Sequence, residues 1–537
     1  MTQERGGPPS RLVSFVSRRW FPLLLVLGAG LRIGLFLQNR SLWVDEARLA
    51  LNILGKTPLE LLGPLEFDQA APPGFLLLVK AAERILGSSE FALRFVPLIW
   101  GLASLPLFFC LARRKLRPAA APLACLLFAI AEPLVYFSTE LKQYSSDVAL
   151  ELALWTLASR VAEPLRPSRL AALGLAGAAA LFLSHTAIFV LGGVGLALLL
   201  GNWPARGKQG LAGLALTFCL WGAALAGVYA LSLHHLTGNA RIIRYFTERA
   251  AGFPPAGVFS EIRWLIGRLL ELFRFPGGLD HGGIPAFCAV VGTVAVFRRE
   301  RSAFVMWIAP GALSLLAALA RLYPFEGRLI LFVVPALYLL VAEGAQEVLL
   351  RTRPGGVLLA GTLIFLLLLH PVAAALDGVE RPRYFEQIRP VLEHVSRARR
   401  SGDVVYLYYA AQYAVRYYME TRRLSVAEAP TSELLAPTAR VATGAVGYEP
   451  ALVSRPPSFY VGSDSRGDSS RYRRELDALA GHPRVWILFS HIVTWSSADE
   501  RRPLLDHLDR IGTRLEAFEE PGASAYLYDL RALRSMD

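Results

Sequence analysis

The sequence is poor in cysteine and in charge, and these shortages exclude several kinds of site. Only four of the 537 residues are cysteine, and 18% are charged. All four cysteines stand in apolar segments, with no Cys-x-x-Cys pair and none in the polar C-terminal region: Cys110, Cys125, Cys219 and Cys288. Neither a disulfide framework nor a thiolate metal site is therefore supported. The sequence also lacks internal repeats and low-complexity tracts.

Hydrophobic residues make up 54% of the chain and recur in runs that short Arg-rich loops interrupt. This pattern is typical of a polytopic membrane protein. The formal net charge is +13, but much of the excess lies in the short loops, where the positive-inside rule expects it. The charge therefore reflects membrane topology, and no nucleic-acid partner is predicted. Residues 21–37 follow a basic start without a small-residue cleavage site, so we expect an uncleaved first span.

One apolar segment is predicted to lie along the membrane surface rather than to cross it. Pro72 to Leu86 is short, about 22 Å as a helix, and it carries Lys80, Glu83 and Arg84. Each charge would cost roughly 2.5 to 3.5 kcal/mol at membrane depth, whereas each Leu returns only about 0.5 kcal/mol. A second surface helix is expected in the loop 233–283, where Arg and Glu interrupt an apolar face. The remaining runs predict about eleven transmembrane helices: 20–37, 91–112, 118–137, 147–161, 169–184, 187–201, 210–232, 284–298, 303–320, 327–347 and 355–374.

The charges of the loops orient these spans. Every loop assigned to the cytoplasm is basic; these loops lie near residues 113–117, 160–169, 206–208, 298–301 and 351–353. The N-terminus is then cytoplasmic. The extracytoplasmic parts are residues 38–90, 138–146, 233–283 and 321–326, the turn at His185 and everything after Ala374. The predicted location is the inner (plasma) membrane.

Beyond residue 374 the sequence becomes charged and mixed, and it predicts a folded α/β domain outside the membrane. Strands are expected at 404–408, 485–489 and 525–528, with helices ending near Tyr418 and over 471–480 and 497–511. Residues 442–470 are rich in Gly, Ser and Pro and predict an irregular loop. The fold class is thus a mainly α polytopic membrane domain with juxtamembrane helices, residues 1–374, followed by an extracytoplasmic α/β domain, residues 375–537.

Two adjacent carboxylates, Asp45 and Glu46 in SLWVDEARLA, follow the first span. They fit the first turn of an amphipathic helix, where acidic side chains favour the helix N-terminus. Asp68 follows in the same outward loop, so the loop places several carboxylates near lipid. A structural role and a catalytic role are both open for this acidic pair.

The next outward segment, STELKQYSSDVALEL, brings Glu140, Lys142, Tyr144 and Asp147 together at the mouth of two spans. Ionisable groups at that depth are costly unless they serve a site or a water-filled cavity. Alternatively, Asp147 could cap its span and Lys142 could bind lipid headgroups.

Three arginines and one histidine complete the candidates. Arg328 begins a span on the outer side and could hold a phosphate, although an arginine that snorkels at a helix end is the commoner case. His185 lies at a tight outward turn, where a structural histidine is commoner than a ligand. Arg32 and Arg94 are weaker candidates of the same kind.

Four motifs occur in an order that resembles one class of membrane enzymes. They are W-x-D-E at 43–46, D-x-x-x-P-P-G at 68–74, G-x-S-E-F-A-L-R-x-x-P at 87–97 and E-L-K-Q-Y-S-S-D at 140–147. The chain resembles GT-C class glycosyltransferases, and it is similar to the protein O-mannosyltransferases and the lipid A aminoarabinose transferases. The resemblance is best over residues 20 to about 200, looser to about 375, and positional only in the C-terminal domain.

The resemblance implies a polyprenyl-phosphate sugar as donor and an extracytoplasmic glycan, lipid or protein as acceptor. It implies Asp45 as the catalytic carboxylate, since an acceptor hydroxyl needs a base as it attacks the anomeric carbon. Glu46 and Asp147 are the further catalytic candidates. The leaving phosphate needs cations, for which Lys142 and Arg328 are the best candidates. Direct displacement with one base predicts inversion. The further candidates for substrate binding are Asp68, Glu140, Tyr144, Arg94 and His185.

One position departs from the pattern of the aminoarabinose transferases. They place a lysine just before the proline of the first loop, where this chain has Asp68, Gln69 and Ala70. Aminoarabinose specificity is therefore not expected. Some GT-C relatives bind a divalent ion through such acidic loops, and Asp45, Glu46 and Asp147 could do so, but we expect no required metal or other cofactor.

Three alternatives stay open. A lipid-linked glycan flippase would explain many spans, although the two related halves with broken helices that transporters usually show are missing. An enzyme of the O-antigen-ligase type would use arginine and histidine in a large outer loop, and the loop 233–283 contains His234, His235, Arg241 and Arg244. A non-catalytic assembly protein is the third alternative, and no residue pattern favours it.

Overall fold

The chain forms two compact units. The computed structural model describes residues 11–161, 167–200, 207–237, 240–248, 250–280, 283–351, 356–381, 383–422, 424, 453–455, 459–463, 469–492 and 500–531. The helical unit contains Met1–Gln38, Lys56–Ile85 and Phe91–Pro382, and the sheet unit contains Asn39–Gly55, Leu86–Glu90 and Arg383–Asp537. Two short stretches of the first 90 residues thus pack with the C-terminal part of the chain. The predicted division after residue 374 assigns these stretches to the membrane domain instead.

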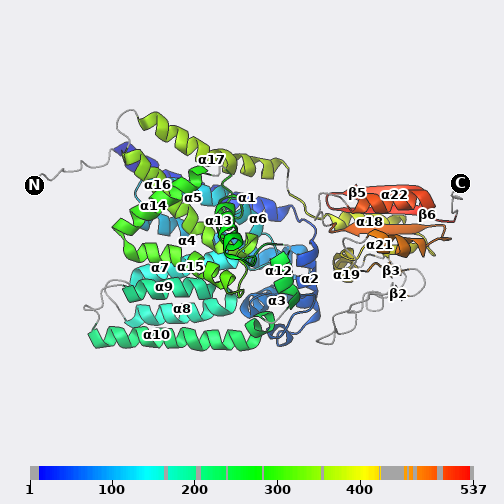
Figure 1. Ribbon diagram of the computed structural model, residues 1–537, viewed down its shortest axis with the longest axis horizontal. Coiled ribbons are helices and arrows are strands. Elements are labelled where there is room, and N and C mark those ends of the chain that lie inside the picture. Colours follow the sequence, from blue (N-terminus) through cyan, green and yellow to red (C-terminus); the bar gives the residue numbers. More distant parts are fainter. Residues whose placement is uncertain are drawn as a thin grey trace, which may run out of the picture. The chain divides into compact units, whose positions relative to one another are not determined.

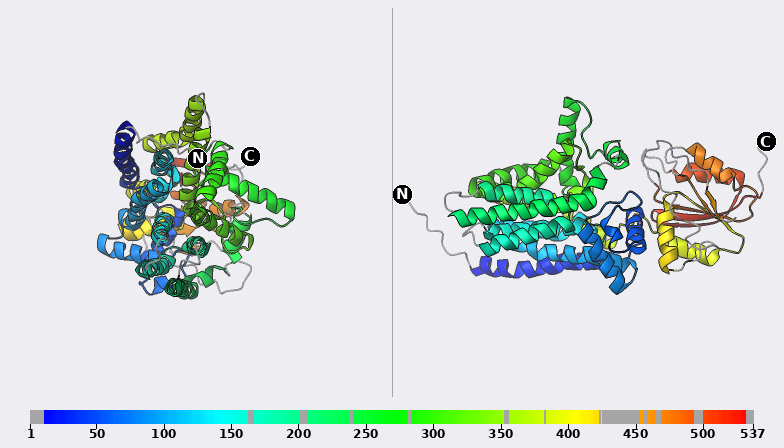
Figure 2. Two further views of the ribbon diagram at one scale, coloured as in Figure 1. Left: turned by 90° about the vertical axis from the view of Figure 1, so that its left-hand side faces the viewer. Right: turned by 90° about the horizontal axis from the view of Figure 1, so that it is seen from below.

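The helical unit consists of long helices that run alongside one another, and one view of Figure 2 shows many of them end on (Figures 1 and 2). In chain order its elements are α1 (Arg11–Leu37), the 3-10 helix η1 (Glu60–Leu62), α3 (Pro73–Leu86), α4 (Glu90–Lys115), α5 (Ala120–Ile130), α6 (Glu132–Phe137), α7 (Tyr144–Val161), α8 (Pro167–Leu183), α9 (Ala187–Leu200), α10 (Gly207–Val228), the π-helix η3 (Tyr229–Leu233), α11 (His234–Thr237), α12 (Ala240–Glu248), α13 (Val258–Arg274), α14 (Gly283–Arg299), α15 (Arg301–Leu319), the 3-10 helix η4 (Gly327–Val333), α16 (Val334–Arg351) and α17 (Gly356–Glu380).

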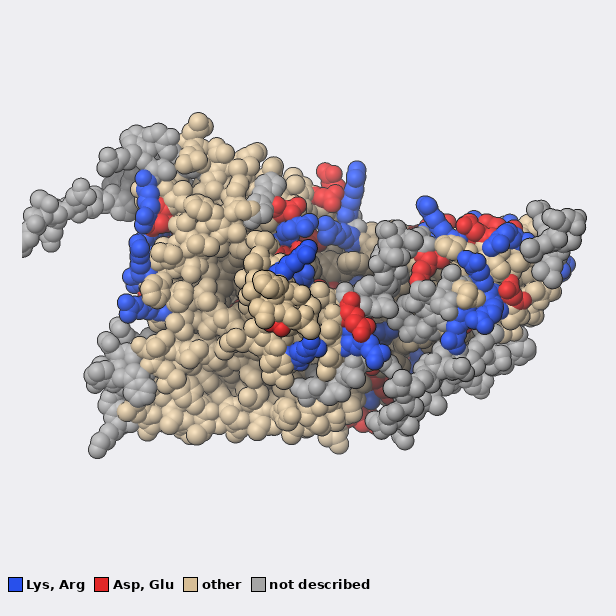
Figure 3. All heavy atoms as spheres, in the orientation of Figure 1, with Lys and Arg blue, Asp and Glu red and all other residues tan. Residues whose placement is uncertain are grey.

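The surface of the helical unit is apolar along several long helices, which indicates contact with lipid. In the most apolar part of α1, Trp20–Leu37, only 22% of the residues are buried, and Leu23 and Val26 are 62% and 71% exposed. Figure 3 shows a broad region of this unit without charged side chains, and lysine and arginine gather at one end of the helices. Soluble proteins rarely expose apolar surface of this extent. The chain is therefore a multi-pass membrane protein.

Every predicted span corresponds to helix, but the number eleven stays a prediction. Within the described residues, six helices are long and apolar enough to cross a membrane: Trp20–Leu37, Glu90–Lys115, Gly210–Leu233, Arg301–Leu319, Gly327–Arg351 and Gly361–Glu380. Three further apolar helices are shorter. The predicted span 118–137 is in fact two helices, because the backbone leaves the helical conformation at Ala131 and restarts with Pro133 in the first turn of α6.

The two predicted surface helices are present as helices. They are α3, which buries Phe75, Leu76 and Val79, and α13, which buries Trp264 and Leu272. Lys80 and Glu83 form an ion pair on α3 with 3.1 Å between Nζ and Oε2, so two of its three charges are matched locally. Their position at a membrane surface stays a prediction.

The helices α14 and α16 approach each other closely. A Cβ atom on Gly292 would overlap the Leu340 carbonyl, and one on Gly344 would overlap the Cys288 carbonyl, so only glycine permits this approach. At the basic ends of these helices, Arg117 and Arg299 both pair with the fully buried carboxylate of Glu343. Small residues and a paired buried charge together fix how the two helices pack.

The sheet unit contains α2 (Val44–Gly55) and an α/β fold from the C-terminal part of the chain. Its later elements are α18 (Ile388–Ala398), β1 (Val404–Leu407), α19 (Ala411–Arg422), β2 (Val453–Arg455), β3 (Phe459–Val461), α21 (Ser469–Asp477), β4 (Val485–Ser490), α22 (Arg501–Ile511), β5 (Thr513–Glu520) and β6 (Ala523–Asp529). The strand order is β2-β3-β1-β4-β6-β5, with β3, β1 and β4 parallel and the other pairs antiparallel.

Both faces of the central strands are buried by helices. Tyr406 and Ile487 point to the face that Leu476 of α21 and Leu508 of α22 cover. The opposite face is covered by α18, which contacts β5 and β6, and by α19, which contacts β4. The expected strands at 404–408, 485–489 and 525–528 and the helices beside them are confirmed, whereas β2, β3 and β5 were not predicted. Residues 497–499 and most of the loop 442–470 lie outside the described residues.

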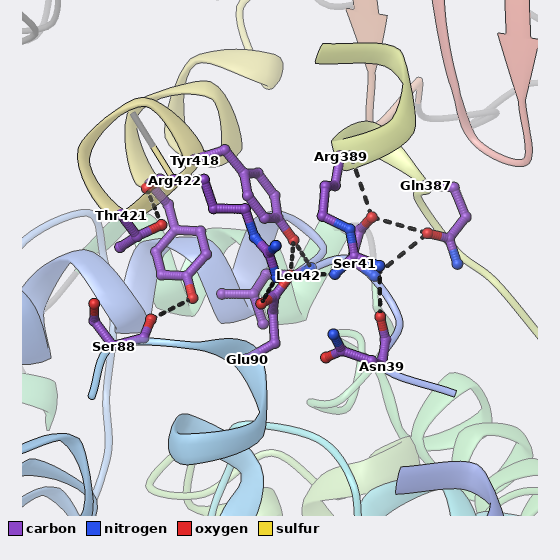
Figure 4. Close-up of polar contacts among 11 residues, drawn as sticks. Asn39, Ser41, Leu42, Ser88, Glu90, Gln387, Arg389, Tyr418, Thr421 and Arg422 are labelled. Atoms are coloured by element: carbon purple, nitrogen blue, oxygen red, sulfur yellow. Dashed lines mark hydrogen bonds and ion pairs between the residues drawn. The ribbon is translucent and has the colours of Figure 1, made fainter. Parts of the chain in front are cut away.

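Glu90 joins the three stretches of the sheet unit (Figure 4). Its carboxylate is fully buried and accepts hydrogen bonds from Arg389 at 2.5 Å, Arg422 at 2.8 Å and the Tyr418 hydroxyl at 3.1 Å. The bonds therefore link residue 90 to α18 and α19, about 300 residues later in the sequence. Charge-assisted bonds of this length are among the stronger hydrogen bonds in proteins.

The same side chains hold the stretch that leads into α2. Arg389 donates to the Asn39 carbonyl at 2.9 Å, and the Tyr418 hydroxyl accepts from the Leu42 N–H at 2.9 Å. Gln387 accepts from the Ser41 hydroxyl at 2.8 Å. Residues 39–42 thus have their backbone fixed by α18 and α19 rather than by their own neighbours.

Candidate functional site

The connection between α6 and α7 is a compact turn in the helical unit that carries several candidate residues. The hydroxyls of Ser138 and Thr139 donate to the carbonyls of Val135 and Tyr136, which satisfies acceptors that the end of α6 leaves open. The Asp147 N–H bonds to the Gln143 carbonyl at 3.0 Å as α7 begins. The backbone groups at both helix ends therefore find hydrogen-bond partners within the turn. The side chains of Glu140 and Lys142 contact other segments.

Lys142 meets the segment before α3. Its Nζ lies 2.7 Å from the Oε1 of Gln69, and both side chains are buried. An amide oxygen orients an ammonium group without neutralising its charge. Lys142 thus places an ammonium group in a buried position, where its attraction to an anion would be strong.

Arg328, Glu140 and Tyr144 form the second contact of this region. The Nη1 of Arg328 lies 3.5 Å from the Oε1 of the buried Glu140 carboxylate. Its guanidinium carbon lies 5.7 Å from the centre of the Tyr144 ring, within the range of a cation–π contact. Arg328 is therefore ordered by a carboxylate and by an aromatic ring at the start of η4.

Asp147 and Tyr323 extend the same region on the side of α8 and α9. Ser184 lies near the buried Asp147 carboxylate, and the Tyr323 hydroxyl donates to the Leu329 carbonyl at 2.7 Å. Burial, together with nearby Asp147 and Tyr144, holds the pKa of Tyr323 well above its ordinary value, so the phenol stays protonated. One turn further along α7, both carboxylate oxygens of Glu151 are buried without a hydrogen-bond partner among the described residues.

The polar side chains of the α6–α7 turn and of the segments around it are here called the polar end cluster: Gln69, Glu140, Lys142, Tyr144, Asp147, Ser184, Tyr323 and Arg328. The loop charges predict that residues 38–90, 138–146, the turn at 185 and the turn 321–326 share one side of the membrane. The cluster takes its side chains from these segments or from the adjoining ends of helices. It holds two cations, two carboxylates and two phenols. A group of this composition at the end of apolar helices can bind a phosphate and stabilise a charged leaving group.

Three other predicted substrate-binding residues lie in the helical unit without a described link to this cluster. Arg94 is buried on α4. Asp68 is exposed in a turn where it and Phe67 both have positive φ, 54° and 61°. The His185 Nε2 lies 3.5 Å from the Ser232 hydroxyl, and burial lowers the pKa of this histidine to about 4 even though part of the residue stays exposed. His185 is therefore neutral at physiological pH, which suits a structural role.

Asp45 and Glu46 lie in the sheet unit, in the first turn of α2. The expected amphipathic helix after this acidic pair is confirmed. Glu46 is buried and Asp45 is partly exposed, so the two adjacent carboxylates have different surroundings. Of the pair, only Asp45 presents a carboxylate that an acceptor could reach.

Sequence reasoning missed four polar residues that the structure brings into these regions: Gln69, Ser184, Tyr323 and, in the sheet unit, Glu386. None of these residues belongs to a periodic pattern. Only their position in or near one of the motifs could have identified them as candidates. Among the described residues there is no group of three or more His, Cys, Asp or Glu side chains placed to hold a metal ion.

Comparison with known proteins agrees with the motifs. Residues 70–226 match the family model described as dolichyl-phosphate-mannose-protein mannosyltransferase. The match confirms the predicted resemblance and the prediction that the chain is a glycosyltransferase of membranes. A search of curated proteins returns no match to the chain.

Several solved structures resemble the chain at low identity. ArnT from Cupriavidus metallidurans in the apo state is 11% identical with a TM-score of 0.49, and the alignment covers 96% of this chain and 98% of that one. Archaeal oligosaccharyltransferase AglB from Archaeoglobus fulgidus, in complex with an inhibitory peptide and a dolichol-phosphate, is 12% identical with a TM-score of 0.49, covering 95% of this chain and 74% of that one. The chain spans 61% of another Archaeoglobus fulgidus oligosaccharyltransferase structure, in complex with Zn and sulfate, at 11% identity and a TM-score of 0.46, with 73% of this chain covered.

Proposed function

We propose that this protein transfers a monosaccharide from a polyprenyl-phosphate donor to an extracytoplasmic glycan, lipid or protein acceptor. The observation that carries the proposal is the pair of cations in the polar end cluster. Lys142 is buried beside a neutral amide, and Arg328 is held by Glu140 and Tyr144. Two ordered cations at the end of apolar helices suit a substrate whose phosphate is attached to a membrane lipid.

The cations supply the part of the chemistry that concerns the leaving group. When the bond between the sugar and the phosphate breaks, negative charge grows on the polyprenyl phosphate. A buried ammonium and a guanidinium stabilise this charge more strongly than water does, because they are already oriented and the local dielectric constant is low. Loss of either cation should therefore slow the transfer.

Asp45 supplies the second part as general base. The acceptor hydroxyl attacks the anomeric carbon, and the carboxylate takes its proton as the new glycosidic bond forms. A single displacement of this kind inverts the anomeric configuration. Glu46 and Asp147 stay proposed catalytic carboxylates, and Asp68, Arg94 and His185 stay proposed contacts to substrate. The site is proposed to face the outside of the plasma membrane, with no required metal.

The test is transfer by purified full-length protein from a radiolabelled polyprenyl-phosphate sugar. The wild type should release labelled product, with turnover unchanged by a chelator, whereas a flippase would only move the lipid between leaflets and a ligase would need a diphosphate-linked glycan. Asp45→Asn should lower turnover by at least about 100-fold while donor binding persists, as expected for loss of a general base. Glu60→Gln, which changes an exposed carboxylate before α3, is the control. Full turnover by Asp45→Asn would remove Asp45 from the mechanism.

Lys142→Met tests the phosphate contact separately. It removes the ammonium group but retains much of the side-chain length, and it should raise the KM for the donor roughly 10- to 100-fold, since a charge-assisted bond contributes about 1.5–3 kcal/mol. A KM within twofold of wild type would contradict the assignment of Lys142. Direct measurement of polyprenyl-phosphate binding to the same variant separates weaker binding from slower chemistry.

A further inference from the structure

The first turn of α2 follows a residue type that rarely caps a helix. The helix begins at Val44, and the first backbone bond of the turn runs from the Ala47 N–H to the Trp43 carbonyl at 2.9 Å. The residue at the capping position is therefore Trp43, whose indole is a hydrogen-bond donor and not an acceptor. Ser, Thr, Asp or Asn would normally stand there.

A carboxylate from a distant part of the sequence accepts from the first N–H of the helix. The Oε2 of Glu386, 342 residues downstream, accepts from the Val44 N–H at 3.1 Å. The bonded N–H belongs to the residue directly before Asp45. A carboxylate at a helix N-terminus is also favoured by the helix dipole. The position of the Asp45 backbone is thus tied to a side chain just before α18.

Glu386 is itself fixed by the end of β4. The Ser490 hydroxyl donates to its Oε2 at 3.2 Å, and the Nδ1 of His491 lies 2.6 Å from its Oε1. His491 has a positive φ of 56°, a conformation that a residue with a side chain rarely adopts without support. Its ring lies 6.3 Å from the ring of Trp43. All these contacts lie within the sheet unit.

We propose that Glu386 is a positioning residue for Asp45, a role that rests on the proposed function of Asp45 as general base. Together with the hydrogen bonds that Arg389, Tyr418 and Gln387 make to residues 39–42, it makes α2 part of the C-terminal fold rather than a loose connection between membrane helices. A base that is displaced by about 1 Å can lose on the order of 100-fold in rate. The C-terminal part of the chain therefore takes part in catalysis by holding the base, whatever it also does in selecting the acceptor.

The test compares Glu386→Ala with Glu386→Gln and with a matched control, Glu475→Ala, in the full-length protein. Glu475 is another buried carboxylate of the sheet unit that accepts from the Tyr406 hydroxyl and from Ser463, and its described bonds do not reach α2. Glu386→Ala should lower kcat on the order of 10- to 100-fold, with the KM for the donor within about twofold of wild type. Glu386→Gln should restore part of kcat, because the amide oxygen can still accept from Val44. Glu475→Ala should lower the melting temperature but leave kcat within about twofold.

Hydrogen exchange gives a readout that does not depend on activity. The amides of residues 44–47 should exchange faster in Glu386→Ala than in wild type or in Glu475→Ala. Equal kcat in the two alanine variants, or unchanged exchange in the first turn of α2, would overturn the proposal. Asp45→Asn is measured alongside them. If it kept full turnover, the proposed base would be wrong and the catalytic role of Glu386 would be overturned with it, whereas the exchange experiment would still decide whether Glu386 caps α2.

Discussion

Removal of the Glu90 carboxylate is expected to loosen the whole sheet unit. Glu90 is fully buried, and it is the common acceptor for Arg389, Arg422 and Tyr418. Breaking a buried ion pair by removing one partner costs about 3–5 kcal/mol. The arginine side chains are 18% and 37% exposed, so water can solvate them in part, and we expect Glu90→Gln to cost about 2 kcal/mol. For a unit of this size, this lowers the apparent melting temperature by about 4–8 °C.

The assay is thermal unfolding of the full-length protein, followed by limited proteolysis as a probe of the sheet unit. The control is Glu420→Gln, which removes a part-exposed i,i+4 pair with Arg416 on α19 and should cost about 0.5 kcal/mol or less. Faster cleavage of the C-terminal part is expected in Glu90→Gln only. Equal melting temperatures for the two variants would refute the reasoning, because they would show that the buried cluster contributes no more than a surface pair.

Two further predictions concern the helical unit. Burial lowers the pKa of His185 to about 4, below its ordinary value of 6.5, so the unfolded chain binds more protons between these values and stability falls as the pH falls from about 6.5 towards 4. His185→Gln should flatten the melting temperature over this range, and an unchanged slope would contradict the assignment. Gly344→Leu should prevent the contact of α14 with α16 and abolish monodisperse folded protein in size-exclusion chromatography. Gly361→Leu on α17 is the matched control, since a Cβ atom there meets no described atom within 4 Å, and similar behaviour of both variants would show that the close approach is not required.

Much of the candidate site could be predicted from the sequence, because placing its ionisable residues beside apolar segments costs free energy. Glu140, Lys142 and Asp147 are ionisable groups beside apolar runs, and the cost of placing them there marks them as candidates without knowledge of the fold. The residues that they contact could not be predicted in this way. Gln69 and Tyr323 are uncharged residues in irregular segments, and neither carries a burial cost that would mark it as a partner of Lys142 or Asp147. Although Gln69 lies within the motif at 68–74, the motif does not show which side chain it meets.

The sequence by itself determined which segments are helices in the membrane part and the alternation of strands and helices after residue 400. Apolar periodicity, loop charge and transfer free energies are local properties, so they can be evaluated one segment at a time. Only the tertiary structure decided that α2 folds with the C-terminal part of the chain and that Glu386 caps it. The physical reason is that a hydrogen bond across 342 residues depends on how separate elements pack, and it leaves no pattern in either stretch of sequence that contributes to it.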